Sequence, residues 1–165
     1  MARTELERAV QPSLVDRLTD EAPGVTADLP ISRDESERRY RTSVRRDLEW
    51  LLNTRRTMEP APPERPELRH SVYDYGLPDT TGVPMDMLRG HERLVAWLED
   101  TIARFEPRLT DVRVRLIEAD QVATPQVRFT IEALLRMDPS PELVVFDTVL
   151  QVARSEYEIG SLDHA

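Results

Sequence analysis

The sequence of 165 residues contains no cysteine, no lysine and only five glycines. Without cysteine there is no disulfide framework, no thiol nucleophile and no thiolate metal site, and so few glycines provide no phosphate-cradling loop. No apolar run approaches the roughly 20 residues of a membrane span. The first ten residues also lack the apolar region of a signal peptide. We therefore expect a cytoplasmic protein without membrane insertion.

The charge balance excludes a further class of function. Charged residues make up 32% of the chain, and the formal net charge is −9. Such a surface repels phosphates, so we expect no nucleic-acid partner. All 22 basic residues are arginine, the residue favoured in flat, two-pronged contacts with carboxylates. This composition indicates protein interfaces, although a GC-rich coding bias explains it equally well.

The chain is organised around a helix, a break and a strand over residues 91–116. Apolar residues recur at helical spacing until Pro107 ends the helix, because proline has no N–H and disfavours helical geometry at Glu106. From Val112 the apolar period becomes two, which predicts a strand. The break therefore places an acid, Glu106, and a base, Arg108, on a stiffened turn.

Length and composition predict one compact domain with looser ends. We expect residues 1–38 to form an arm and linker, because proline, glycine and acidic residues dominate from residue 19 to residue 37. We expect residues 39–155 to form a single compact wedge domain. Residues 156–165 are polar and predict a loose tail.

The arm contains one apolar stripe, on a short helix expected at about residues 12–19. Leu14, Val15 and Leu18 share one side of that helix. One or two helical turns are not stable alone in water. The stripe therefore packs either on this domain or on another protein.

A second helix is expected to begin at a cap formed by Thr42 or Ser43. Its core side is apolar at offsets of four, seven and eight, and comprises Val44, Leu48, Leu51 and Leu52. Arg46 and Trp50 lie on a different side of this helix. Trp50 either covers a second core surface or anchors a partner, and Arg46 with Asp47 is able to pair with another element.

The remaining elements predict a sheet. A short strand is expected at residues 70–75, with Tyr73 and Tyr75 on one side, after a proline-rich connection. Strands are expected at residues 127–134 and 143–152, with turns at residues 118–120 and 138–141. Short turns favour antiparallel pairing. The predicted class is α+β, with an antiparallel sheet of three to four strands packed against two main helices and an N-terminal arm.

The sequence offers little catalytic chemistry. The three histidines lie far apart, without metal-ligand spacing, and we expect no cofactor and no metal. The best enzyme hypothesis is a peptidoglycan glycoside hydrolase with Glu106 as the acid and Asp111 or Asp147 as its partner. The neighbouring Arg108 favours the ionised form of Glu106, which is wrong for a general acid. We therefore expect no enzyme activity.

Three motifs in order resemble those of one family. They are the runs Arg46–Arg55 (RDLEWLLNTR), Ser71–Asp79 (SVYDYGLPD) and Phe105–Leu109 (FEPRL). They are similar to the TssE family, the small wedge subunit of the type VI secretion baseplate, which is related to the wedge proteins of contractile phage tails. Some of those relatives are labelled lysozyme-like. The early run Pro12–Leu18 also resembles the family's N-terminal motif.

The resemblance implies a structural role at a baseplate beneath the inner-membrane complex. Its implied partners are the wedge subunits TssF and TssG, then TssK, the sheath subunits TssB and TssC, and the spike and inner-tube region. The subunit would help start the contractile sheath, on a sheet edge that accepts a strand from a neighbour.

The same resemblance implies partner contacts in two regions. The elbow residues Glu106, Pro107 and Arg108 are expected to hold baseplate partners, with an ion pair inside the chain as the alternative reading of Glu106 and Arg108. The stripe on the early helix is expected to dock on the TssF–TssG wedge. A third possibility is a regulator that binds sheath protein but not the wedge.

Overall fold

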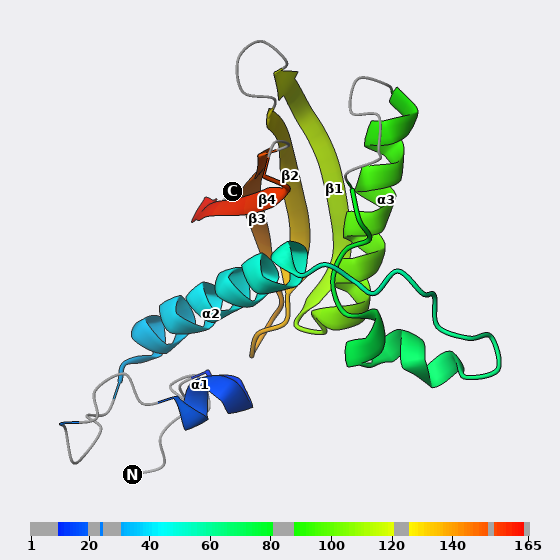
Figure 1. The fold of residues 1–165 in the computed structure, drawn as a ribbon. Helices are drawn as coiled ribbons and strands as arrows, with labels where there is room; N and C mark the ends of the chain where they lie inside the picture. Colours follow the sequence, from blue (N-terminus) through cyan, green and yellow to red (C-terminus); the bar gives the residue numbers. More distant parts are fainter. Residues whose placement is uncertain are drawn as a thin grey trace.

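The computed structural model describes residues 10–19, 24, 31–80, 88–120, 126–151 and 154–163. The described chain forms helices and a four-stranded antiparallel sheet, so the predicted α+β class is confirmed (Figure 1). In chain order the elements are α1 (Leu14–Leu18), α2 (Arg33–Asn53), the 3₁₀-helices η2 (Pro66–His70) and η3 (Val72–Asp74), α3 (Leu88–Phe105), β1 (Leu109–Asp120), β2 (Gln126–Leu135), β3 (Glu142–Gln151) and β4 (Glu156–Asp163). The sequence also predicts a polar helical start after Gly82 and Pro84, and this segment lies outside the described residues.

The strands form a meander in the order β1-β2-β3-β4, so β1 and β4 are the two edges. Every second residue of β2 is buried, namely Val127, Phe129, Ile131, Ala133 and Leu135. In β3 the buried residues are Val144, Phe146, Thr148 and Leu150. The period of two read from the sequence is therefore the pattern of one buried sheet face. The predicted Val152 lies outside the described residues.

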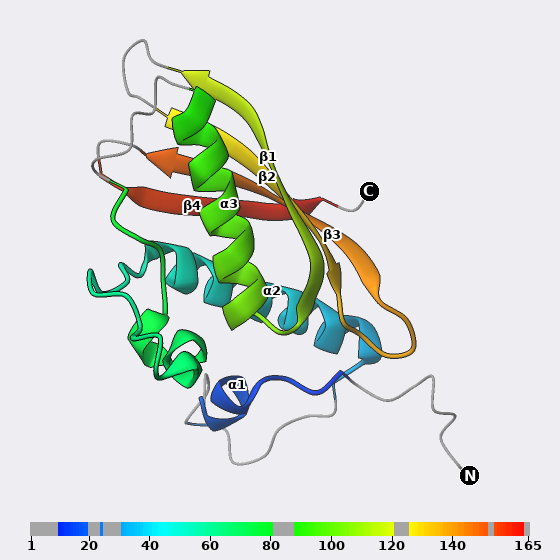
Figure 2. The ribbon, with the colours of Figure 1, turned by 90° about the vertical axis from the view of Figure 1, so that its right-hand side faces the viewer.

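Both long helices contribute to the core on that buried face. α3 packs against β1, and α2 packs against β4 (Figures 1 and 2). α3 buries Leu94, Leu98 and Ile102, and α2 buries Val44, Leu48, Leu51 and Leu52, all at 0–2% exposure. The predicted apolar sides of both helices are thus confirmed.

The predicted start of the second helix was wrong. α2 begins at Arg33, after Ser32, whose side chain accepts the N–H of Glu35 at 3.2 Å. Ion pairs one turn apart stabilise this polar first part, such as Arg33 with Glu37. Neither Thr42 nor Ser43 caps the helix. The linker expected at residues 19–37 extends into the first turns of α2, and the domain boundary expected at residue 38 lies inside α2. The pattern missed these turns because they lack an apolar stripe.

The strand expected at residues 70–75 is also absent, since η2 and η3 occupy this segment. The hydroxyl of Ser71 accepts the N–H of Tyr73 at 3.2 Å, and such local side-chain bonds compete with a strand ladder. Tyr75 packs edge-on against Phe105, with 5.3 Å between ring centroids, whereas Tyr73 is at the surface. The two tyrosines therefore do not share one side of a strand.

Two further predictions failed at the sheet. The segment expected to be a loose tail forms β4, because Tyr157 and Ile159 fill the core beside β3. The turn expected at residues 118–120 is instead the end of β1, paired with β2. Shifts in the register of β1 and a left-handed backbone at Asp111, with φ of 53°, bend this long edge strand. The turn at residues 138–141 does join β2 to β3.

Candidate functional site: a buried elbow and an outward-facing helix

Residues 106–108, which we call the elbow, connect α3 to β1. The N–H of Glu106 still bonds to the carbonyl of Ile102 at 2.9 Å, and the N–H of Leu109 closes the turn on the carbonyl of Glu106 at 3.1 Å. Within the turn, Nε of Arg108 donates to Oε1 of Glu106 at 2.6 Å, and its Nη2 donates to Oε2. Glu106 is only 4% exposed, whereas Pro107 is at the surface. The acid and base of the elbow therefore form a two-pronged ion pair inside the chain.

Arg108 also fastens the elbow to α2. Its Nη2 donates to Oδ2 of Asp47 at 2.7 Å, and its Nη1 lies 3.4 Å from Oγ of Ser43. The guanidinium is 5.9 Å from the ring centre of Tyr40. Burial lowers the pKa of Arg108, but its bonds to Glu106 and Asp47 outweigh burial and raise that pKa above the ordinary value. Arg108 is therefore a permanent cation shared between two carboxylates.

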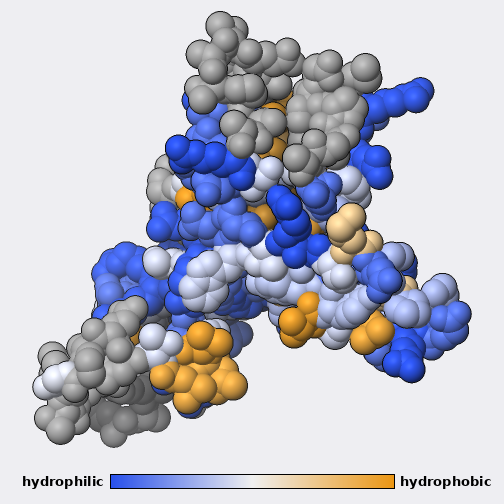
Figure 3. Space-filling view, viewed as in Figure 1, coloured by the Kyte–Doolittle hydropathy of each residue, from blue (hydrophilic) through white to orange (hydrophobic). Residues whose placement is uncertain are grey.

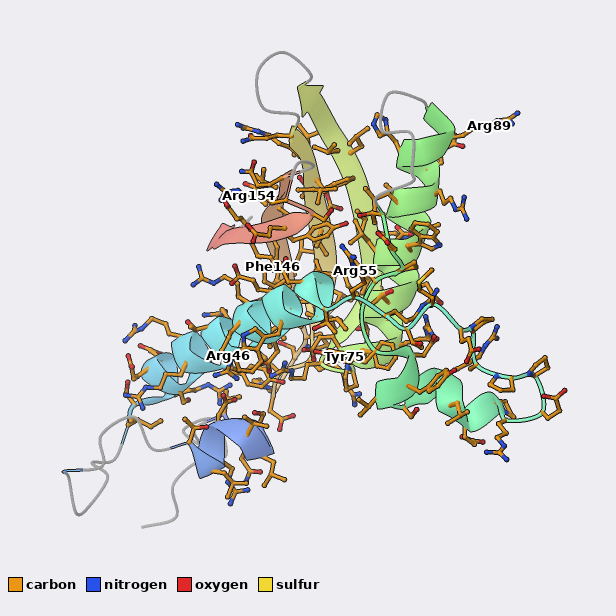
Figure 4. The ribbon with its side chains drawn as sticks, in the orientation of Figure 1. Arg46, Arg55, Tyr75, Arg89, Phe146 and Arg154 are labelled. Carbon is orange, nitrogen blue, oxygen red and sulfur yellow. The ribbon has the colours of Figure 1, made fainter. Side chains whose placement is uncertain are left out.

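The run of ion pairs continues from α2 to α1. Arg46 donates from Nη2 to Asp47 at 2.8 Å and to Oδ1 of Asp16 at 2.7 Å. Asp16 is also the third residue of α1 in a reciprocal cap with Ser13, whose Oγ lies 2.6 Å from its carboxylate. Figure 4 shows Arg46 in the space between α2 and α1. An unbroken chain of charges thus joins α1, α2 and the elbow: Asp16, Arg46, Asp47, Arg108 and Glu106.

A second buried carboxylate fixes η3 to α3. Asp74 is 5% exposed; Nη1 of Arg104 donates to its Oδ2, and Nε of Arg56 lies 3.5 Å from its Oδ1. Arg104 also donates to the carbonyl of Arg69 at 3.1 Å. A buried carboxylate is stable when cations and donors surround it. Here that arrangement holds the short 3₁₀ segment in one position.

The three motifs, far apart in sequence, meet at this place. The first and second motifs join by a backbone bond from the N–H of Leu77 to the carbonyl of Thr54 at 2.9 Å. The N–H of Arg56, directly after the first motif, bonds to the carbonyl of Leu77 at 2.8 Å. The second and third motifs meet where Tyr75, labelled in Figure 4, packs on Phe105. The first and third meet at Asp47 and Arg108. Each motif therefore positions the other two.

The apolar stripe of the arm faces away from the chain. Leu14, Val15 and Leu18 are 69%, 57% and 77% exposed, and no residue of α1 is buried. A surface helix normally turns its apolar side to the core. α1 instead attaches through the polar Asp16, and its apolar residues form a patch in the lower part of Figure 3. Such an arrangement leaves an apolar surface for another molecule.

Trp50 adds to this surface. It is 56% exposed, so it does not cover a second core surface, and the guanidinium of Arg46 lies 4.8 Å from its ring centre. The Arg46 that holds α1 therefore also lies over Trp50. We call Leu14, Val15, Leu18, Arg46 and Trp50 the arm surface.

The structure thus divides the predicted site residues into two groups. Glu106 and Arg108 pair inside the chain, which was the alternative reading, and a partner role for either one stays a prediction. In the arm surface, Leu14, Val15, Leu18 and Trp50 are exposed, whereas Arg46 is half-buried and links α1, through Asp16, to Trp50. Sequence reasoning did not single out Asp16, although the Ser-x-x-Asp spacing at residues 13–16 was a signal for a helix cap. It also missed Asp74 and Arg104, whose pairing spans 30 residues and leaves no local pattern.

The geometry does not favour the hydrolase hypothesis. Both oxygens of Glu106 are bonded to Arg108 and its side chain is 5% exposed, so a sugar oxygen has no access to them. Asp111 and Asp147 are both exposed, and Asp147 lies 3.5 Å from the hydroxyl of Thr130. Among the residues that the structure describes, no group of three or more His, Asp or Glu is arranged to hold a metal ion.

These features define a class of protein. Buried and half-buried ion pairs connect the helices and the elbow into one unit, and an apolar patch is turned outward on that unit. This combination is typical of a subunit that works by binding other proteins. Within the described ranges, no helix has the length and apolar character needed to cross a membrane.

Comparison with known families identifies the particular group. The family described as baseplate wedge protein gp25 matches residues 38–140, and this chain belongs to that family. The matched range contains most of α2 and the whole of η2, η3, α3, the elbow, β1 and β2. The chain is therefore a structural component of a phage-like baseplate that contacts other baseplate components. Searches of the curated proteins and of the solved structures gave no match.

Proposed function

We propose that this chain is a TssE-type wedge subunit of a type VI secretion baseplate. Family membership supports the general role of a baseplate wedge protein. The finer assignment is supported by the resemblance of three motifs that the fold gathers into one ionic and aromatic cluster. In this role the subunit joins the wedge, helps start the contractile sheath and catalyses no reaction.

The arm surface is proposed to dock on the TssF–TssG wedge. The observation that carries this proposal is that α1 attaches through Asp16 and exposes Leu14, Val15 and Leu18. Tryptophan and arginine, which the arm surface also contains, are enriched among the residues that contribute most to binding energy. A prepositioned helix also loses less entropy on binding than a free peptide.

The elbow is proposed to serve the same assembly in two ways. The internal pairs of Glu106 and Arg108 hold α2, and through it α1, in the docking position. Pro107 at the surface and the exposed part of Arg108, 17% of its side chain, remain available to a neighbouring subunit. Partner contact and internal support are thus compatible in one short turn.

The further partners are proposed from the family resemblance. TssK and the spike and inner-tube region would lie near the wedge, beneath the inner-membrane complex. TssB and TssC would begin the sheath on an edge of the sheet, where main-chain groups are able to pair with an added strand.

Copurification with TssF and TssG tests the proposal. We expect the double substitution Leu14→Ser and Leu18→Ser, and separately Trp50→Ala, to weaken wedge binding about tenfold or more. Thermal stability should change little, because these side chains are more than half exposed. Met58→Ser is the matched control, since Met58 is 92% exposed at a different place.

Unchanged wedge binding by both arm variants would refute the docking assignment. Binding of the wild-type chain to TssB and TssC, without binding to TssF and TssG, would indicate a sheath regulator instead. A zymogram on peptidoglycan completes the test, because a cleared band would show the hydrolase activity that we do not expect.

A further inference from the structure

The outer edge of β4 is closed at one position by a side chain of α2. Oδ1 of Asn53 accepts the N–H of Tyr157 at 2.8 Å, and Nδ2 of Asn53 donates to the carbonyl of Tyr157 at 2.9 Å. The same Nδ2 donates to the carbonyl of Glu49 at 2.9 Å, which fixes the orientation of the amide. The carboxamide thus makes the two bonds that a residue of a fifth strand would make.

The opposite edge has a similar closure from α3. Oε1 of Glu99 accepts the N–H of Val114 in β1 at 2.9 Å. Each long helix therefore directs one polar side chain onto the strand that it packs against. Two closures of this kind, at opposite edges of one sheet, indicate that both protect an edge strand.

Edge strands need protection because their unpaired backbone groups are a template for another chain. β4 has a second device of this type, since its register with β3 shifts so that Gly160 and Ser161 face Asp147 alone. Such a bulge interrupts regular pairing. The stretch from Glu156 to Ile159 lies before the bulge and is regular. Asn53 closes the middle of that regular stretch.

A strand from another molecule is able to compete with Asn53 for the N–H and carbonyl of Tyr157. Asn53 is exposed, and an open pocket of about 440 Å³ lies beside it between the end of α2 and the start of β4. A second strand is therefore able to approach the amide from solvent. The acidic Glu156 and Glu158 hinder a like-charged strand, but salt screens that repulsion at the surface.

We propose that Asn53 is an edge guard, which keeps β4 from pairing with β4 of a second copy of this chain. Two such edges would otherwise meet antiparallel and continue the sheet across both copies. Glu99 guards β1 in the same way, with one bond instead of two. This guard acts on the free subunit and is separate from wedge binding at the arm surface. A sheath strand added at either edge, as proposed above, would first have to displace Asn53 or Glu99.

Self-association of the full chain tests the proposal. We expect wild-type protein to sediment as a monomer across a hundredfold concentration range at raised salt. Asn53→Ala should dimerise about tenfold or more tightly than wild type, since it frees one N–H and one carbonyl at an edge. Asn53→Asp should be intermediate, because the carboxylate still accepts the N–H of Tyr157 but cannot donate to its carbonyl.

Hydrogen exchange at the Tyr157 amide provides the site-specific readout. The wild-type amide should be protected, and in Asn53→Ala it should exchange faster in the monomer but become protected again as the dimer forms. Met58→Ser is the control, since Met58 is 92% exposed and takes part in neither edge closure; it should leave the chain monomeric with the Tyr157 amide protected.

Three results would overturn the proposal. The first is an unprotected Tyr157 amide in the wild type, which is measurable even if Asn53→Ala does not fold. The second is a folded Asn53 variant with a fast Tyr157 amide that stays monomeric. The third is dimerisation through β4 in the wild type. Wedge binding is measured separately through the arm surface, so failure here does not affect that assignment.

Discussion

The ion pairs of the elbow make a quantitative prediction for Arg108→Met. The substitution removes the cation between Glu106 and Asp47 and keeps much of the apolar length of the side chain. Glu106 is left with a 5% exposed side chain and no cation, whereas Asp47, at 24%, keeps its bond to Arg46. Removing one partner of a buried ion pair costs ~3–5 kcal/mol. Because Asp47 stays partly solvated and paired, we expect a loss at the lower end, about 3 kcal/mol.

A double-mutant cycle separates the pair from the packing. Glu106→Leu alone should also destabilise the chain, since it leaves Arg108 with Asp47 as its only carboxylate. The double substitution should cost less than the sum of the two single changes, with a coupling of about 2 kcal/mol. In the double variant both side chains are apolar, so no buried charge is left without a partner. The double change therefore destabilises the chain less than the two single changes added together.

Urea unfolding followed by tryptophan fluorescence and circular dichroism measures each free energy of unfolding. A loss below about 1 kcal/mol for Arg108→Met, or a coupling near zero, would contradict a stabilising role for the elbow pair. The variants that fold also separate the two roles of the elbow. If they bind the wedge normally, Arg108 and Glu106 act only inside the chain.

Two further predictions concern α1 and the segment after η3. Partial burial raises the pKa of Asp16, but hydrogen bonds from Ser13 and Arg46 outweigh it and hold the pKa below the ordinary 3.8. The ion pair that attaches α1 should therefore be fully formed above pH 3.8 and be lost as the pH falls through the lower pKa of Asp16 in the folded protein. An NMR titration of the Asp16 carboxyl with a midpoint above 3.8 would contradict this. Gly76 has φ of 100°, and a Cβ there would lie 2.2 Å from the carbonyl oxygen of Thr54, so Gly76→Ala should cost about 3 kcal/mol in urea unfolding. Gly24→Ala, where a Cβ meets nothing within 4 Å, is the control, and equal stability of the two variants would refute the role given to Gly76.

Apolar periodicity predicted the core well because the buried residues of each helix or strand follow a short, regular spacing in the sequence. The apolar side of α3, the stop at Pro107 and the alternation in β2 and β3 were all confirmed. The same method failed where side-chain hydrogen bonds and ion pairs, and not regularly spaced apolar residues, stabilise an element. The first turns of α2 depend on a serine cap and ion pairs, and η3 depends on Ser71 and on the buried Asp74. In β4 only Tyr157 and Ile159 alternate before Gly160 and the register shift, so the apolar pattern was too short to be recognised.

The amino-acid sequence alone was enough to predict the α+β class, the buried side of each long element and the family, because each depends on residue types at short or fixed spacing. The partner that each charged side chain takes depends instead on how distant segments pack together. The flexible arginine side chains reach carboxylates 30 or 61 residues away, as Arg46 does with Asp16 and Arg108 with Asp47. The exposure of Leu14 and Trp50 likewise depends on where α1 lies against α2. Contacts between distant segments arise when the chain packs, so no local pattern records them.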